Sequence, residues 1–402
     1  MDLRLSESER ALQAELRRWL AANLPGLGPP PARDDWPARA AFDRAWQRRL
    51  LDAGYAGFDW PREYGGRGAP PGEQLVFLEE MAGAGAPDVG VNFVGLLHAG
   101  PTLMAEGTPE QRAAHLPAIL RGDEIWCQGF SEPSAGSDLA ALRTRAERDG
   151  DEYVVSGQKI WSSFAQVADH CELLVRTDPE AARHRGISWL MMDMSSPGIT
   201  VRPIRTAMGS SEFSEVFLDE VRVPVASRVG AENDGWRVAM VTFAFERGTA
   251  FVTELVQAMR MANELVAVAR RVTRGSATAW DDVGLRRELG RLVAELDALW
   301  ALTKRNVSRA SRSGVPGPGA SVLKLRLCEA AQELAELSMR VLGRAGLALE
   351  DVGELSSGRF VEERLRSLGL TIGGGTSQIQ RNIVAERVLG LPKEPPAPAP
   401  GP

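Results

Sequence analysis

The 402-residue sequence is poor in cysteine and histidine, and it has no long apolar run. Its three cysteines are scattered and odd in number, so they form neither a disulfide framework nor a metal-ligand pattern, and we expect a reducing, cytoplasmic environment. The four isolated histidines show no zinc-binding spacing, and we expect no metal site. Residues 1–20 are charged and amphipathic, unlike a signal peptide, and no run approaches the ~20 apolar residues of a membrane span.

The charge balance also excludes a class of partner. With a formal net charge of −6 and no basic domain that would neutralise phosphates, we expect no nucleic-acid partner. The composition, 44% hydrophobic and 25% charged, is that of a globular protein. The length exceeds one small core and predicts two or three units.

The hydrophobic periodicity predicts an α+β multidomain protein. Residues 1–122 have helical periodicity, with Leu12, Leu16 and Leu20 on one stripe. From 123 to 232, short apolar runs separated by turn residues indicate a middle antiparallel β-barrel or sandwich. Residues 233–392 return to long amphipathic helices joined by short breakers, which is typical of a four-helix bundle. The tail, 393–402, is proline-rich and expected to be disordered.

The most informative stretch runs from Trp126 to Ser163. Its loop, residues 130–138, is made of small polar residues, proline and glycine, which suits a backbone that bends closely around a ligand. A hairpin signal at Asp149-Gly150 and the strand-like run 159–163 follow. The stretch therefore predicts a loop and β platform that presents hydroxyls, an amide and one large aromatic. An ordinary surface turn and hairpin would explain the same residues.

The spacing of these segments resembles the flavin-binding core of the acyl-CoA dehydrogenase family. The likeness runs in the family's order along nearly the whole chain, through residues 131–138, 157–163, 209–223, 245–247 and 375–382. The resemblance implies an N-terminal helical domain, a middle β domain and a C-terminal four-helix bundle. It also implies FAD as cofactor, an acyl-CoA or acyl-carrier-protein thioester as substrate, an electron-transfer flavoprotein as acceptor, and a homo-dimer or homo-tetramer.

The resemblance also assigns roles to individual residues. The family's contacts to the isoalloxazine ring fall on Gln128, Phe130, Ser131, Trp161 and Ser163. Its contacts to the adenine dinucleotide end of FAD fall on Thr376, Ser377 and Gln378, after a glycine run whose free N–H groups suit a pyrophosphate. Ser137 matches a contact to the pantetheine arm, and Arg247 matches an arginine bordering the substrate channel. Core packing for Trp161 and a structural ion pair for Arg247 are the alternatives.

Glu246 is the candidate catalytic base. Thr242 and Phe243 lie beside it at helical spacing, and apolar surroundings would raise the pKa of its carboxyl towards the range useful to a base. A Glu-Arg pair on a helix is more often simply solvated. In the family, however, the base occupies either this position or the one matched here by Gly374, which has no side chain. Glu246 is therefore predicted to take the α proton while FAD accepts the β hydride.

Two departures from the family pattern keep alternatives open. Where many members have Gln-x-x-Gly-Gly, this chain has Arg340 and Arg344 in place of the Gln and the second Gly. Together with Gly374, they are compatible with a subunit of a hetero-oligomeric dehydrogenase that lacks a complete site of its own. A flavin oxidase or monooxygenase on the same fold is a further alternative, because fold does not determine chemistry.

Overall fold

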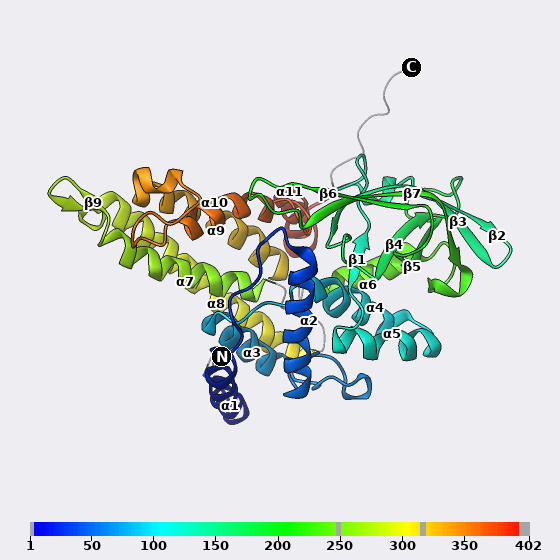
Figure 1. Cartoon of the computed structure of the whole chain (residues 1–402), viewed down its shortest axis with the longest axis horizontal. Coiled ribbons are helices and arrows are strands. Elements are labelled where there is room, and N and C mark those ends of the chain that lie inside the picture. Colours follow the sequence, from blue (N-terminus) through cyan, green and yellow to red (C-terminus); the bar gives the residue numbers. More distant parts are fainter. Residues whose placement is uncertain (1–3, 247–250, 314–318, 394–402) are drawn as a thin grey trace, which may run out of the picture. The chain divides into compact units, whose positions relative to one another are not determined.

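The structure is a computed structural model in which residues 4–246, 251–313 and 319–393 are described. Of the tail predicted to be disordered, 393–402, only Lys393 belongs to the described residues. The chain divides into two compact units, one of residues 5–250 and one of residues 251–402 with the first four residues. Figure 1 traces both units.

The first unit begins with helices, as predicted. They are α1 (Glu7–Asn23), α2 (Trp36–Asp52), α3 (Pro71–Ala84), the π-helical turn η3 (Gly95–Ala99), α4 (Gly100–Glu106) and α5 (Pro109–Arg121). Helix α1 starts where Ser6 accepts from the Glu9 N–H and Glu9 accepts from the Ser6 N–H, a reciprocal cap. Thr108 and Gln111 cap α5 in the same way, with proline at the first helical position.

The middle of the chain forms one sheet. Its strands are β1 (Trp126–Gly129), β2 (Arg145–Asp149), β3 (Glu152–Ser163), β4 (His170–Arg176), β5 (Ile187–Asp193), β6 (Ile199–Ile204), β7 (Phe213–Pro224) and β8 (Arg228–Val229). Within the described residues their order is β6-β7-β3-β2-β4-β5-β8, with β1 beside β4. The predicted antiparallel pairing is confirmed for most neighbours, while β1 and β2 each pair with β4 in parallel.

Helix α6 (Gly235–Glu246) closes the first unit by packing against the sheet. It contacts β5, α4 and η3, and Figure 1 shows it among α4, α5 and the strands. Buried Leu174, Ile187 and Trp189 face a core shared with the helices, whereas Val155 and Leu173 belong to a separate core within the sheet. The two faces of the sheet are thus both covered, one by helices and one by its own curvature.

The second unit is helical. It contains α7 (Val252–Ala269), the short pair β9 (Thr273–Arg274) and β10 (Ala277–Thr278), α8 (Val283–Ser313), α9 (Gly319–Leu342), α10 (Gly358–Leu370) and α11 (Ser377–Ile383). Helices α7 to α10 share one core, in which Leu265, Leu292, Leu334 and Phe360 are at most 1% exposed. The predicted helical bundle is confirmed.

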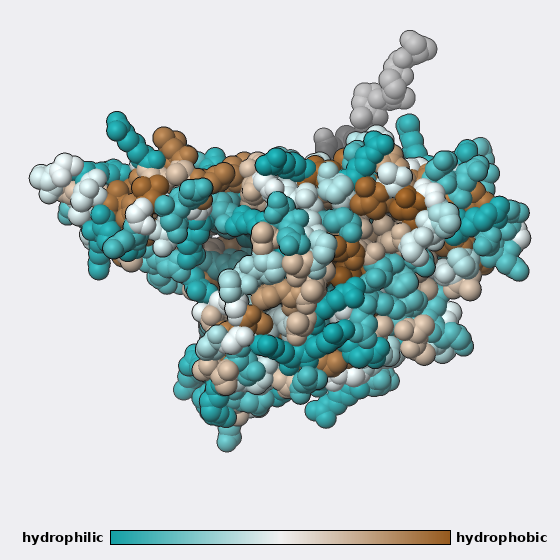
Figure 2. All heavy atoms as spheres, in the orientation of Figure 1, coloured by the Kyte–Doolittle hydropathy of each residue, from teal (hydrophilic) through white to brown (hydrophobic). Residues whose placement is uncertain are grey.

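Apolar side chains remain at the surface of the second unit. Leu347 and Leu349, which follow α9, are 86% and 63% exposed, and Ile372 is 67% exposed. Figure 2 shows hydrophobic side chains at the surface over the α9–α10 segment. Exposed large apolar side chains gather at interaction surfaces when they lie side by side. Among the described residues, no helix is long and apolar enough to cross a membrane.

Candidate functional site

A buried ion pair holds the loop that follows β1. Lys159 on β3 is fully buried, and its Nζ donates to Glu132 Oε1 at 2.8 Å and to the Phe130 carbonyl at 3.2 Å. The second oxygen of Glu132 accepts from the Arg143 N–H at 2.7 Å, and the Thr144 N–H donates to the first at 2.8 Å. Burial opposes the charge of Glu132, but the Lys159 ammonium and these donors outweigh it and lower the pKa of the carboxyl.

The same loop is hydrogen-bonded to β3 through its backbone. The Ile160 N–H donates to the Ser131 carbonyl at 3.0 Å, next to the Lys159 contact. Ser131 is therefore fixed beside Ile160, and both Ser131 and Ser163 are half-buried. Ser137 lies farther along the loop, exposed to solvent, beside Asp138, which pairs with Arg183. The arrangement is a rigid platform with hydroxyl groups at its surface.

Trp161 is presented by a β-bulge. Lys159 pairs with Val216 and Ser162 with Ser214, so the two residues between them on β3, Ile160 and Trp161, oppose the single residue Glu215 of β7. Trp161 has a left-handed backbone, φ 62°, and its residue is 56% exposed. Such a conformation costs a bulky residue about 1 kcal/mol or more, and bulges that re-aim side chains are common beside active sites. Core packing, the alternative interpretation of Trp161, is contradicted by this exposure.

Gln128 contacts two buried residues, His98 and Glu172, that the sequence analysis does not identify as site residues. Its Nε2 lies 3.2 Å from His98 Nδ1 and donates to Glu172 Oε1 at 2.8 Å. His98 and Glu172 are also 3.4 Å apart, and Glu172 is 0% exposed. Because the Gln128 amide nitrogen faces this pair, the orientation of the amide is fixed. His98 and Glu172 thus place a buried polar network beside the predicted ring contacts.

Phe130 connects the platform to α6. It is buried, and its ring meets that of Phe243 edge-on with centroids 5.8 Å apart. Glu246 is the last residue of α6, one helical turn beyond Phe243. The side chain of Glu246 and the whole of Arg247 lie outside the described residues.

The predicted dinucleotide residues lie in the second unit, at the start of α11. Thr376 caps the helix by accepting from the Ile379 N–H at 3.2 Å, Ser377 is buried, and Gln378 is exposed. The glycine loop before them is held by Lys324, a buried lysine on α9 whose Nζ donates to the carbonyls of Gly373 at 2.7 Å and Gly375 at 2.5 Å. Lys324 was missed by the sequence analysis, although it falls on the apolar stripe of α9.

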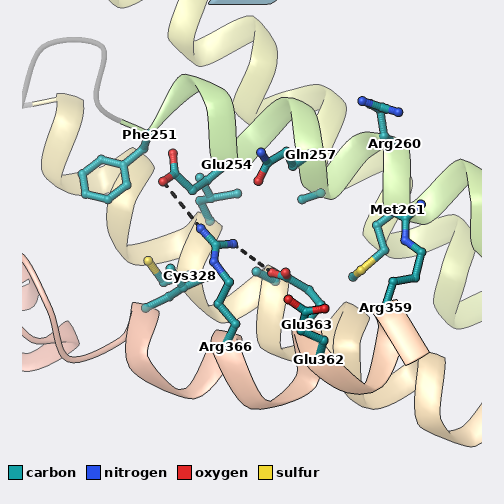
Figure 3. A pocket seen from close by; sticks show the side chains of 14 residues that line it. Phe251, Glu254, Gln257, Arg260, Met261, Cys328, Arg359, Glu362, Glu363 and Arg366 are labelled. Carbon is teal, nitrogen blue, oxygen red and sulfur yellow. Dashed lines mark hydrogen bonds and ion pairs between the residues drawn. The ribbon is translucent and has the colours of Figure 1, made fainter. Parts of the chain in front are cut away.

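A pocket of about 270 Å³ also lies in the second unit, between α7, α9 and α10. Figure 3 shows Arg366 in its middle, between Glu254 at 3.9 Å and Glu363 at 3.2 Å. Burial raises the pKa of Glu363, although the Arg366 charge opposes the shift. The other charged side chains that line the pocket are those of Arg260, Arg359 and Glu362. A cavity with three acidic and three basic groups is a poor match for a hydrocarbon chain, so we give it no role in acyl binding.

The comparisons with known proteins agree with this architecture. The sequence matches three family descriptions in order: "Acyl-CoA dehydrogenase, N-terminal domain" over residues 6–123, "middle domain" over 127–221 and "C-terminal domain" over 233–389. The chain belongs to the acyl-CoA dehydrogenase family. Family members are FAD-dependent oxidoreductases, and the cofactor predicted from the sequence is confirmed at this level.

Individual relatives are similar over their whole length. The acyl-CoA dehydrogenase IpdE1 of Mycobacterium tuberculosis is 42% identical, over 95% of this chain and 97% of that protein. The solved structure of the Tcur3481-Tcur3483 steroid ACAD is 33% identical with a TM-score of 0.85, covering 98% of this chain and 100% of that one. A ChsE4-ChsE5 complex from Mycobacterium tuberculosis is 36% identical, also with a TM-score of 0.85 and the same coverage.

The chemistry of the first unit's platform fits the ring system of FAD. A flavin ring needs an aromatic surface and hydrogen-bonding groups along its polar edge. The exposed Trp161 and the half-buried hydroxyl residues Ser131 and Ser163 offer both, and they are brought together with Gln128 and Phe130 by the β1, β3 and loop contacts described above. Thr376, Ser377 and Gln378 belong to the other unit.

Proposed function

We propose that this acyl-CoA dehydrogenase oxidises the α,β bond of an acyl-CoA thioester to the 2-enoyl-CoA, with Glu246 as the base. The carboxylate of Glu246 takes the α proton, and the hydride leaves from the β carbon. FAD, when bound, supplies the hydride acceptor, and an electron-transfer flavoprotein is the proposed final acceptor of the electrons. The observation that carries the proposal is the exposed Trp161 on its bulge, beside the loop that Glu132 and Lys159 hold rigid.

The choice of Glu246 rests on two features of the chain. Gly374, at the family's other position for the base, offers no carboxylate and has a φ of 61° that suits glycine. Helix α6, by contrast, is anchored by buried Val238, Ala239 and Thr242 and ends at Glu246. A general base of this kind contributes about 10²- to 10⁴-fold to the rate.

The remaining predicted residues receive roles consistent with their surroundings. Gln128, Phe130, Ser131, Trp161 and Ser163 would hold the isoalloxazine ring, with Trp161 against its face. Ser137, exposed in the loop, would contact the pantetheine arm, and Arg247 would border the substrate channel. At the adenosine half, the Thr376 hydroxyl accepts from the Ile379 N–H and can donate its own hydrogen to the cofactor. Exposed Gln378 can donate through its amide.

For the acyl group, we propose a ring-bearing thioester rather than a straight chain. The support is the steroid ACAD, which is 33% identical to this chain over nearly all of it. The test is anaerobic titration of the purified flavoprotein with straight-chain and steroid-side-chain acyl-CoAs, followed by flavin absorbance. Bleaching with the ring-bearing thioester at much lower concentration supports the proposal, and bleaching only with straight chains contradicts this substrate class. Rapid peroxide release in air would favour the oxidase alternative.

A partner subunit of a different sequence is a second proposal, and a specific surface favours it. Arg340 is half-exposed and pairs with Glu288 at 2.6 Å, Arg344 is exposed, and the strongly exposed Leu347 and Leu349 follow directly. Two structural relatives are complexes named for two different proteins. The test is to purify the chain alone and after co-expression with a second member of the family, and to measure the molecular mass and the flavin content of each preparation. A full flavin complement and unchanged activity in the chain alone would contradict it.

A further inference from the structure

Two of the four histidines, far apart in the sequence, meet one carboxylate in the first unit. His115 lies on α5, Glu124 lies in the connection before β1, and His170 is the first residue of β4. His115 Nδ1 is 3.0 Å from Glu124 Oε2, and His170 Nε2 is 3.7 Å from Glu124 Oε1. One ligand atom from each of the three residues lies within 4.8 Å of the others. Because they come from three different elements, sequence spacing gives no sign of this cluster.

We propose that His115, Glu124 and His170 form a binding site for a divalent transition-metal ion of the zinc type. Two imidazoles and one carboxylate are a ligand set that zinc uses, with an open position for water. Ligand atoms in tetrahedral zinc sites are about 3.3 Å apart, given metal–ligand distances of about 2.0–2.1 Å, so small side-chain rotations suffice here. The three side chains are 17%, 18% and 22% exposed, which leaves access for an ion and for the water that completes its coordination.

The surroundings of the cluster support a ligand role for Glu124. The Trp126 indole N–H donates to Glu124 Oε2 at 3.1 Å and orients the carboxylate, as outer-shell partners do in metal sites. The nearby carboxylates of Asp169 and Asp193 accept hydrogen bonds from Ile125 and Ser195 respectively, and they stay outside the ligand set.

The position of the site links it to the flavin platform. Strands β1 and β4 run in parallel, with Trp126 opposite His170 and, two residues on, Gln128 opposite Glu172. Side chains two residues apart in a strand share a face, so the cluster lies at the start of the ladder that carries Gln128. An ion bound there would tie α5 to the first residues of both strands. The ion would stabilise the start of both strands without contacting Gln128 itself.

The test uses the full chain with its FAD bound. The purification tag is removed, the protein is treated with a chelator, and ZnCl₂ is titrated into it by calorimetry. We expect one zinc ion per chain, a higher melting temperature in its presence, and at least ~10-fold weaker binding in His115→Ala, His170→Ala and Glu124→Gln. His184→Ala is the matched control, because His184 is exposed and lies in the connection that follows the last residue of β4, whereas His170 is the first, and it should bind like the wild type.

A second measurement covers variants that fail to fold. CoCl₂ added to the wild-type protein should give the visible bands of tetrahedral cobalt with nitrogen and oxygen ligands, and added zinc should abolish them. The proposal is overturned if zinc binding by the wild type is weak and not saturable at one equivalent. It is also overturned if the three ligand variants bind zinc as tightly as the His184 control, because the cluster would then be an ion-pair network only.

Discussion

The buried pair of Lys159 and Glu132 yields the sharpest prediction about stability. Replacing Lys159 with Met leaves the Glu132 carboxylate buried without its countercharge, and breaking a buried pair in this way costs about 3–5 kcal/mol. Two backbone N–H groups, of Arg143 and Thr144, still donate to Glu132 in that variant. We therefore expect Lys159→Met to fall near the lower end, about 3 kcal/mol, or about two orders of magnitude in the unfolding equilibrium.

The opposite substitution should be worse. Among the described residues, Glu132→Ala leaves the Lys159 ammonium with only the Phe130 carbonyl as an oxygen partner, so we expect a loss near the upper end, about 5 kcal/mol. The double variant, Glu132→Ala with Lys159→Met, should cost clearly less than the sum of the two single variants, because neither charge is left unpaired.

The assay is urea unfolding followed separately by tryptophan and flavin fluorescence, since a chain with two units need not unfold in one transition. Arg222→Met is the control: its exposed ion pairs with Asp149 and Glu152 lie in the same sheet, and its loss should leave the midpoint nearly unchanged. An unchanged midpoint for Lys159→Met, or additive losses in the double variant, would refute the reasoning.

Three further predictions concern the platform and the glycine loop. Trp161→Ala should weaken FAD binding about 10-fold or more while the urea midpoint of the FAD-free protein stays unchanged, because the side chain lies largely in solvent; equilibrium dialysis of FAD checks this. Lys324→Met should free the carbonyls of Gly373 and Gly375 and raise hydrogen exchange in residues 373–379, measured by mass spectrometry. Because folding lowers the pKa of Glu132 below its usual 4.5, its contribution is complete above pH 4.5 and is lost as the pH falls through the folded-state pKa. The stability gap between wild type and Glu132→Gln should therefore narrow below pH 4.5, and a gap independent of pH would contradict that sign.

The sequence predicted the architecture well because periodicity and caps are local signals. Leu12, Leu16 and Leu20, predicted to share one stripe, are the buried residues of α1, the short apolar runs of the middle part form the sheet, and Thr376 caps α11 after the glycine run. The parallel pairing of β1 with β4 was not predicted, because it joins segments more than 40 residues apart whose apolar runs look alike in either direction.

The candidate site residues also differ in whether a local signal or a contact between distant segments brings them to the site. Trp161 could be predicted as a site residue because its motif is contiguous, but the bulge that exposes it depends on register with β7. Lys159 and Glu132 are 27 residues apart, and His98 is 30 residues from Gln128, so neither pairing leaves a local trace. A lysine at a strand or helix position otherwise occupied by apolar residues was the available signal, and it applied to both Lys159 and Lys324.

The central claim is that Glu246 removes the α proton, and one measurement tests it most directly. Wild-type protein and the Glu246→Gln variant, both loaded with FAD, are mixed anaerobically with an acyl-CoA that bleaches the wild type, and flavin reduction is followed by stopped flow. The account predicts equal flavin content and reduction slowed by about 10²- to 10⁴-fold in Glu246→Gln. Near-normal reduction of the variant flavin would contradict it and move the base to another residue.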